Sequence, residues 1–266
     1  AHIGANVVVQ GPARIAARCE IAPFVVILGN TELGPDCRVH AHAVIGDVPQ
    51  DRAFDGSVSY CRIGAGCTIR EGVTIHRGTA PDSATTIGKR CLLMTNAHVG
   101  HNCQLGDDVT LISGGLIGGH VNVGDRAVIS GNAAIHQFVR IGELAMISGL
   151  GKITQDVPPF CMTDRDGAIV GLNQVGIRRA SISADEQQEL KFIFRQYYRT
   201  GKSHHQALEF LFEAIATPAG RRLLDFLRAE TKRGVARAAE MRKRSHSSRG
   251  NVPPAECDSP QEVADR

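Results

Sequence analysis

Two histidines stand three residues apart in the segment NAHVGHNC, residues 96–103, which is too short for a helix and, with its glycine, unlike an ordinary strand. The nearest further histidines on the two sides of His98 and His101 are His76, His120 and His136. A neutral imidazole can accept the proton of a hydroxyl group while that group attacks a carbonyl carbon. Three imidazoles can instead hold a catalytic zinc ion if they converge on it. The residue types alone leave both chemistries open.

The elements that position these histidines follow from a six-residue period. An aliphatic residue recurs at every sixth position in eight hexapeptides from Ile3 to Ile45, three from Ile63 to Ile75 and twelve from Ile87 to Ile153. This period fits neither a helix nor an alternating strand. It predicts a β-solenoid over residues 1–160, in which each hexapeptide forms one short strand and a turn and three hexapeptides form a coil. The interruptions near 46–62 and 80–86 are predicted to be insertion loops that carry specificity.

The predicted coil places the histidines together. Counting three hexapeptides onward from His101 leads to Gly119, and so puts His101 next to His120 on the following coil. The same count from His120 leads to Phe138, which is two residues from His136. We therefore expect the histidines to line up along one edge of the solenoid, outside its core. A shared edge favours a functional site over isolated surface histidines.

The cysteines fit the solenoid rather than a disulfide framework. Five of the eight fall on the small fifth position of a hexapeptide, namely Cys19, Cys37, Cys67, Cys91 and Cys103. No CxxC pair occurs. These side chains are expected to be reduced, buried and apolar in character.

A different pattern follows the repeats. Residues 161–240 are predicted to form a C-terminal α-helical domain, with helix starts marked by the capping residues Ser183, Ser203 and Thr217. Residues 241–266 are rich in Arg, Ser, Pro and Glu, and we expect them to be disordered.

Charge and hydropathy limit the partners. The chain has 30 basic and 27 acidic residues, and 17 of the basic against 12 of the acidic residues follow Gly176. This modest excess, with only nine Phe, three Tyr and no Trp, favours an acidic protein partner over a nucleic acid. No apolar run approaches the roughly 20 residues that span a bilayer. The sequence therefore predicts a soluble, cytoplasmic protein.

Five segments together carry a specific resemblance. They are IREGVTIHRGT (69–79), LLMTNAHVGHNC (92–103), GGHVNVGD (118–125), AIHQFVRIG (134–142) and QDVPPF (155–160). In this order they resemble the acyl-carrier-protein-dependent UDP-N-acetylglucosamine O-acyltransferases, which begin lipid A synthesis, and the match runs to about residue 235. The resemblance implies a left-handed parallel β-helix and a homotrimer with active sites in the grooves between neighbouring prisms. It implies no cofactor, because acyl carrier protein brings its phosphopantetheine thioester as a co-substrate of the UDP-sugar.

The resemblance also implies residue roles. His101 matches the general base that deprotonates the sugar 3-hydroxyl as it attacks the thioester. The N–H of Gly119 matches the oxyanion donor, which is commonly worth on the order of 3 kcal/mol. Residues that match substrate-positioning groups are Asp51, His76, His98, His120, His136, Gln137, Asn173 and Arg179. Gly149 matches the position that measures acyl-chain length, where the missing side chain predicts a long groove.

Some residues depart from the family pattern. Asn102 stands where the family usually has Asp, and Arg52-Ala53 replaces the end of a QDLK segment. Other departures are Gly167, Val175 and Ala180. They leave open a paralogue that acylates a 3-amino UDP-sugar and a catalytically inactive scaffold. A zinc hydratase resembling the γ-carbonic anhydrases, which use three histidines across a trimer interface, is a further alternative.

Overall fold

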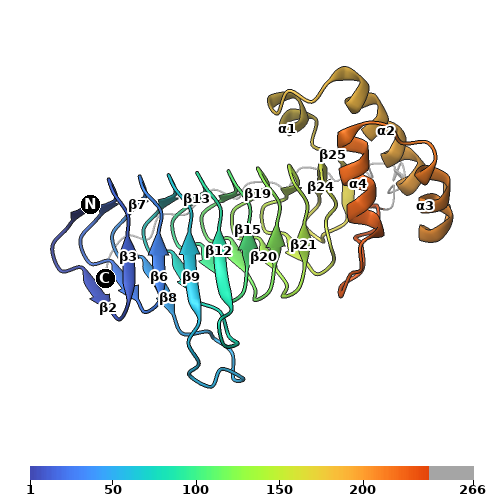
Figure 1. Ribbon diagram of the computed structural model, residues 1–266. Coiled ribbons are helices and arrows are strands. Elements are labelled where there is room, and N and C mark those ends of the chain that lie inside the picture. The colour runs from blue at the N-terminus through green and yellow to red at the C-terminus, as the bar shows by residue number, and fades with distance from the viewer. Residues whose placement is uncertain (240–266) are drawn as a thin grey trace, which may run out of the picture.

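The computed structural model describes residues 1–239 and shows a three-sided prism followed by a small helical domain (Figure 1). The prism is a left-handed parallel β-helix in which each of the 23 predicted hexapeptides forms one strand, β1 to β23. The predicted solenoid is therefore confirmed. From β1 to β23, strands that are neighbours within a sheet are three apart in sequence, because each coil contributes one strand to each side.

The three sides of the prism are called sheets A, B and C. Sheet A contains, in spatial order, β1 (His2–Ile3), β4 (Glu20–Ile21), β7 (Arg38–Val39), β10 (Thr68–Ile69), β13 (Leu92–Leu93), β16 (Thr110–Leu111), β19 (Val128–Ile129), β22 (Met146–Ile147), β24 (Cys161–Thr163) and β25 (Ile169–Leu172). Sheet B contains β2 (Val8–Gln10), β5 (Val26–Leu28), β8 (Val44–Asp47), β11 (Thr74–His76), β14 (His98–Val99), β17 (Leu116–Ile117), β20 (Ala134–Ile135) and β23 (Lys152–Ile153). Sheet C contains β3 (Ala13–Ile15), β6 (Thr31–Leu33), β9 (Tyr60–Ile63), β12 (Ala84–Ile87), β15 (Gln104–Leu105), β18 (Asn122–Val123) and β21 (Arg140–Ile141).

Each hexapeptide of the inner coils buries two side chains. One is the periodic aliphatic residue, and the other is the small residue two positions before it, as in Leu105 with Cys103. All seven cysteines within residues 1–239 are buried and free. The five that the repeat predicts to be buried, Cys19, Cys37, Cys67, Cys91 and Cys103, occupy the small position of their hexapeptides. The core is therefore a stack of similar layers whose stability comes from neighbouring coils.

The helical domain begins later than the sequence suggested. Residues 161–172 form β24 and β25, which extend sheet A, because β24 pairs with β22 in parallel and β25 returns antiparallel to it. The helices are α1 (Gln174–Arg179), α2 (Ala184–Tyr198), α3 (His204–Phe212) and α4 (Pro218–Arg228). The predicted capping residues precede α2, α3 and α4, whereas α1 was not predicted. The expected disordered tail lies outside the described residues.

No helix within residues 1–239 combines the length and the apolar character needed to cross a membrane.

Candidate active site

The histidines gather on the corner between sheets B and C, which we call the histidine edge. It contains His76, His98, His101, His120 and His136, carried by the four successive coils that contain β11, β14, β17 and β20. Backbone hydrogen bonds connect these coils at the edge, for example from the His120 N–H to the His101 carbonyl at 2.9 Å. The predicted alignment of the histidines is therefore confirmed.

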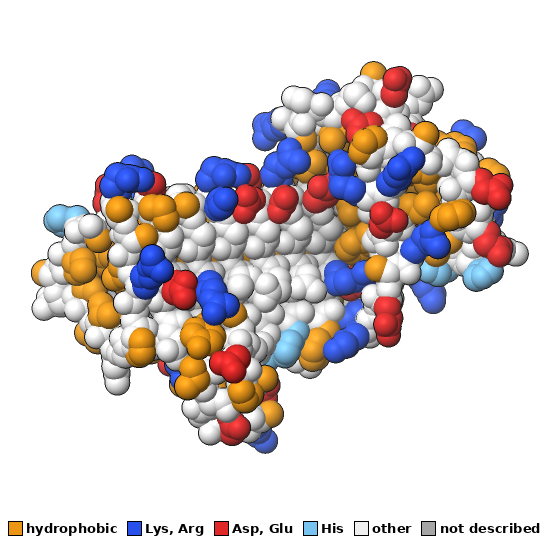
Figure 2. All heavy atoms as spheres, in the orientation of Figure 1, with side chains coloured by type: hydrophobic (Ala, Val, Ile, Leu, Met, Phe, Trp, Pro, Cys, Tyr) orange, Lys and Arg blue, Asp and Glu red, His pale blue; other side chains and the backbone are white. Residues whose placement is uncertain are grey.

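The first insertion marks one end of this edge. Residues 48–59 lie between β8 and β9 and project from the lower corner of the prism in Figure 1. The space-filling view shows a histidine side chain on the same corner, between this projection and a group of basic side chains (Figure 2). The upper corner, between sheets C and A, carries acidic and basic side chains close together instead (Figure 2).

His101 is held at one ring nitrogen and open at the other. Its Nδ1 lies 2.7 Å from Thr79 Oγ1 and 3.0 Å from Asn102 Oδ1. The Thr79 N–H donates to the same Asn102 oxygen at 2.9 Å, which fixes the orientation of that amide. Two oxygen atoms around Nδ1 favour the tautomer with the proton on Nδ1. The lone pair is then on Nε2, which is the state that a general base requires.

The open nitrogen of His101 faces Gly119 and Asp51. A Cβ atom at Gly119 would lie 2.6 Å from Cε1 and 3.0 Å from Cδ2 of the imidazole, so only glycine leaves room for this ring. The Asp51 carboxylate, at the base of the first insertion, lies 3.8 Å from Nε2. This distance is too long for a hydrogen bond, but it places a negative charge beside the nitrogen that would accept a proton.

The Gly119 N–H is available to a ligand. Within residues 1–239 it has no hydrogen-bond acceptor. At two equivalent turns on the corner between sheets C and A, an aspartate of the next coil accepts this N–H, from Lys89 at 2.7 Å and from Asp107 at 2.9 Å. The coil after Gly119 has Gln137 at the corresponding place, and that side chain does not accept the bond. The arrangement leaves a base and a backbone donor next to each other.

His76, which is buried, and His98, which is half-buried, form a pair beside the base. Their rings meet edge to face with centroids 5.2 Å apart, and Thr74 Oγ1 lies 2.8 Å from His98 Nδ1. Burial lowers the pKa of His98 to about 4 and also lowers the pKa of His76. Both rings are therefore neutral near pH 7. The Nδ1 atom of His76 is buried without a hydrogen-bond partner in the described part of the chain.

His120 and His136 lie further along the edge, under a C-terminal segment. The His120 ring meets His101 edge to face at 5.1 Å and stacks on Phe138 at 4.7 Å, and burial lowers the pKa of His120. Arg233 hydrogen bonds to the His136 ring and donates to the Gln137 carbonyl oxygen at 2.9 Å.

Residues 231–238 form the C-terminal segment that lies along this end of the edge, and they are fixed to the prism by a buried carboxylate. Asp156 accepts hydrogen bonds from Arg140 Nε at 2.7 Å and from Thr231 Oγ1 at 2.5 Å, and its backbone pairs with Val235. Lys232 lies over the Phe138 ring at 4.6 Å. The segment therefore brings two cations to the end of the histidine edge.

Three expected site residues lie on other corners of the same prism. Gly149 follows β22 and lies on the corner between sheets A and B, where an added Cβ would meet nothing closer than 3.6 Å. Asn173 caps α1, accepting the Gly176 N–H at 2.9 Å and donating to the Leu144 carbonyl at 2.8 Å, which places it at the corner between sheets C and A. Arg179 ends the same helix. One chain does not bring these residues to His101.

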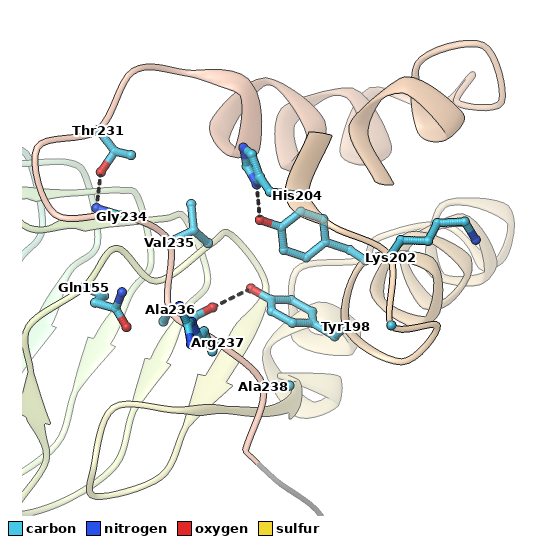
Figure 3. A pocket seen from close by; sticks show the side chains of 12 residues that line it. Gln155, Tyr198, Lys202, His204, Thr231, Gly234, Val235, Ala236, Arg237 and Ala238 are labelled. Carbon is cyan, nitrogen blue, oxygen red and sulfur yellow. Dashed lines mark hydrogen bonds between the residues drawn. The ribbon is translucent and has the colours of Figure 1, made fainter. Parts of the chain in front are cut away.

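A cavity of about 570 Å³ lies away from this site, between the C-terminal segment and helices α2 and α3 (Figure 3). Two tyrosine hydroxyls of its lining are bonded to other lining residues. The Tyr197 hydroxyl lies 2.6 Å from His204 Nδ1, and the Tyr198 hydroxyl donates to the Ala236 carbonyl at 3.3 Å (Figure 3). Burial raises the pKa of Tyr197 to about 12, so this hydroxyl stays protonated. The Tyr198 bond connects the helical domain to the C-terminal segment, which indicates a structural role for the groups around this cavity.

The residues that are present do not make a metal site within one chain. No three His, Cys, Asp or Glu side chains within residues 1–239 are arranged to hold a metal ion. A zinc hydratase would need ligands from a neighbouring chain.

Comparisons with known proteins match both parts of the chain. Residues 156–236 match the model of the second domain of UDP-N-acetylglucosamine O-acyltransferase, and residues 12–47 match the bacterial transferase hexapeptide model. An acyl-[acyl-carrier-protein]–UDP-N-acetylglucosamine O-acyltransferase from Gloeothece citriformis is 41% identical over 208 residues, which are 78% of this chain and 75% of that protein. The protein of the same name from Aeromonas salmonicida is 42% identical over 82% of this chain and 84% of its own length.

The chain belongs to the UDP-N-acetylglucosamine O-acyltransferase family. A crystal structure of a UDP-N-acetylglucosamine acyltransferase from Bacteroides fragilis covers 89% of this chain and 99% of its own, with 30% identity and a TM-score of 0.81. The expected family is therefore confirmed.

The sequence did not point to Thr79, one of the two residues that hold the base, or to Lys232 and Arg233 at the end of the histidine edge. Thr79 directly precedes the interruption of the repeat near 80–86, so counting by whole coils does not align it with His101. Lys232 and Arg233 are far from the histidines in sequence, and nothing in the repeat indicates that they return to this edge. The stacking of Phe138 on His120 could have been predicted, because the two residues are one full coil apart in the sequence.

Proposed function

We propose that this chain transfers a 3-hydroxyacyl group from acyl carrier protein to the 3-position of UDP-N-acetylglucosamine, the first step of lipid A biosynthesis. The proposal rests on the surroundings of the His101 imidazole. Its Nδ1 contacts Thr79 and Asn102, its Nε2 has no hydrogen-bond partner in the described residues, and the ring lies against Gly119, whose N–H has no acceptor there. Relatives at 41% and 42% identity bear the name of this activity. No cofactor is proposed, because the thioester of the donor is already activated.

The geometry supports a proton relay at one nitrogen. Nε2 of His101 accepts the proton of the sugar hydroxyl while that oxygen attacks the thioester carbonyl carbon. The carbonyl oxygen becomes an oxyanion, to which the Gly119 N–H donates. The tetrahedral intermediate then collapses, the C–S bond breaks, and the thiolate leaving group takes the proton from Nε2. Asp51, 3.8 Å from Nε2, stabilises the transient imidazolium.

Asn102 distinguishes this site from the usual family pattern. Its amide oxygen orients the imidazole as a carboxylate would, but it adds no negative charge at Nδ1. The base therefore depends more on Asp51 than on its neighbour in sequence. An amine is a better nucleophile than a hydroxyl and needs less help from a base, so a 3-amino UDP-sugar is the second candidate acceptor.

We further propose a homotrimer in which the complete site lies between chains. The expected site residues occupy all three corners of one prism, and a three-fold axis parallel to the prism would bring corners of different chains together. In such a groove, Gly149, Asn173 and Arg179 of one copy would approach the histidine edge of another. Size-exclusion chromatography with light scattering should give three times the chain mass of 28.5 kDa, and a monomer with full activity would contradict the shared site. The cytoplasm is the proposed location.

The experiment that tests the function is mass spectrometry of the products from mixed donors and acceptors. The donors are acyl carrier protein with 3-hydroxyacyl chains of different lengths, and the acceptors are UDP-N-acetylglucosamine and its 3-amino analogue. An ester product supports the proposal, an amide product alone supports the second candidate, and no acyl product with any pair contradicts both.

A further inference from the structure

A buried thiol lies directly behind the peptide group that would stabilise the oxyanion. Cys103 is completely buried, and its Sγ lies 3.0 Å from the Gly118 carbonyl oxygen on the next coil. This carbonyl and the Gly119 N–H belong to the same peptide group. In the described part of the chain, the Cys103 thiol is the one donor to this carbonyl. Because the carbonyl and N–H of a trans peptide point in opposite directions, a carbonyl turned inward to the thiol turns the N–H outward.

The contact repeats along the prism, so it is a property of the fold. Thiols of other coils donate to glycine carbonyl oxygens at 3.1 or 3.2 Å, in the pairs Cys19 and Gly34, Cys37 and Gly64, Cys67 and Gly88, and Cys91 and Gly106. After Gly88 and Gly106, the next N–H is taken by an aspartate of the following coil. The peptide behind Cys103 differs from these two, because its N–H has no acceptor within residues 1–239. The Ala65 N–H, after Gly64, is also without an acceptor there, but no histidine stands beside it in the sequence, and Pro35, after Gly34, has no N–H.

Glycines pack closely around this peptide. A Cβ atom at Gly100 would lie 2.8 Å from the Gly119 nitrogen and 2.9 Å from the Gly118 carbonyl carbon, so it would press on the peptide group itself. Gly119 itself has no side chain, which leaves the His101 ring beside the same peptide. The peptide is thus held from behind by a donor, and its N–H lies beside the base without an acceptor in the described residues.

We propose that Cys103 is a positioning residue for the acyl-transfer reaction. Its S–H hydrogen bond to the Gly118 carbonyl fixes the plane of the Gly118–Gly119 peptide and polarises the N–H that meets the oxyanion. Hydrogen bonds at the two ends of one peptide strengthen each other, and an aligned donor avoids reorganisation during the reaction. The inference rests on the proposed function, because the oxyanion exists only if acyl transfer occurs.

The protonation state of the thiol agrees with this role. Burial raises the pKa of Cys103 to about 12, so the S–H donor is present throughout the working pH range. A thiolate at this position would repel the carbonyl oxygen instead.

The test uses two nearly isosteric substitutions that differ in the donor. In the same column of sheet C, neighbouring coils have Thr85, Val121 and Val139, all buried, so both side chains fit this position. Cys103→Val removes the donor and should lower kcat about 3- to 10-fold, with KM for the UDP-sugar within about twofold. Cys103→Thr keeps a donor and should retain kcat within about twofold of wild type. Equal kcat for the Val variant and wild type, or a loss confined to KM, overturns the proposal.

Cys91→Val is the matched control, because it removes the same thiol-to-glycine bond on another corner, where Val109 follows in the column. It should leave kcat within about twofold of wild type. A loss of kcat equal to that of Cys103→Val would mean that the thiols act only through stability, and would overturn the proposal.

A second readout does not depend on activity. In protein labelled with ¹⁵N-glycine, the Gly119 amide proton should move upfield by on the order of 0.2 ppm in Cys103→Val and not in Cys91→Val. An unmoved Gly119 resonance refutes the polarisation. If wild type transfers no acyl group, the proposed function fails, while this resonance still decides whether Cys103 polarises the peptide.

Discussion

Gly119→Ala should disable the enzyme without unfolding it. The new Cβ would lie 2.6 Å from Cε1 and 3.0 Å from Cδ2 of His101, whereas carbon atoms in contact are about 3.5 Å apart. The imidazole must therefore retreat by about 1 Å and lose its bonds at Nδ1 to Thr79 and Asn102. A displacement of this size at a reacting group costs on the order of 100-fold in rate. The backbone φ of Gly119 is outside the left-handed region, so alanine itself adds no backbone strain.

The assay is kcat for acyl transfer, with thermal unfolding measured in parallel. Gly29→Ala is the control, because its Cβ would meet only the Gln10 carbonyl at 3.9 Å, and it should retain full activity. In a His101→Ala background, Gly119→Ala should lower kcat little further, because the imidazole that the new Cβ would displace is already absent. A folded Gly119→Ala variant with more than a third of wild-type kcat would refute the placement of the imidazole.

Three further predictions follow from the same contacts. Asn102→Asp puts a carboxylate beside the His101 imidazole and should move the acidic limb of the pH profile of kcat/KM to higher pH. An unmoved limb would show that residue 102 does not contact Nδ1 of His101. The pKa of His98 is about 4 in the folded protein and about 6.5 in the unfolded chain, so between these values the folded state binds fewer protons. Calorimetry should therefore show Tm falling as pH drops from 6.5 towards 4, and falling less in His98→Asn. Asp156→Asn leaves Arg140 without its buried carboxylate and should cost about 3 kcal/mol in denaturant unfolding, whereas Asp36→Asn, at an exposed ion pair, should cost little.

The fold was predictable from the sequence because one spacing rule governs it. Each aliphatic position fixes one strand, and every third hexapeptide returns to the same side, so the edge that carries His101, Gly119 and His120 follows from counting. The rule holds because neighbouring coils must bury the same positions. It fails where an insertion lengthens a coil, as between Thr74 and His98, which pair in sheet B although more than three hexapeptides separate them. The missed partner Thr79 lies within this lengthened coil.

Other parts of the site depend on contacts that no local pattern records. Arg233 reaches His136 from a distant part of the chain, and Asp156 holds that segment through side-chain bonds that the repeat does not specify. Asn173 matches a substrate-positioning residue by resemblance, yet within one chain both ends of its amide are used to cap α1 and to bond Leu144. Its role towards a substrate stays a prediction, as do the roles of the other residues on the far corners.

The most direct test of the account compares acyl transfer by wild type and His101→Ala. The substrates are 3-hydroxyacyl carrier protein and UDP-N-acetylglucosamine, and His40→Ala, a histidine on the corner between sheets A and B, is the control. The account predicts an acylated UDP-sugar from wild type and the control, and a rate at least about 100-fold lower from His101→Ala. Equal rates in wild type and His101→Ala would contradict the central claim that this imidazole is the base.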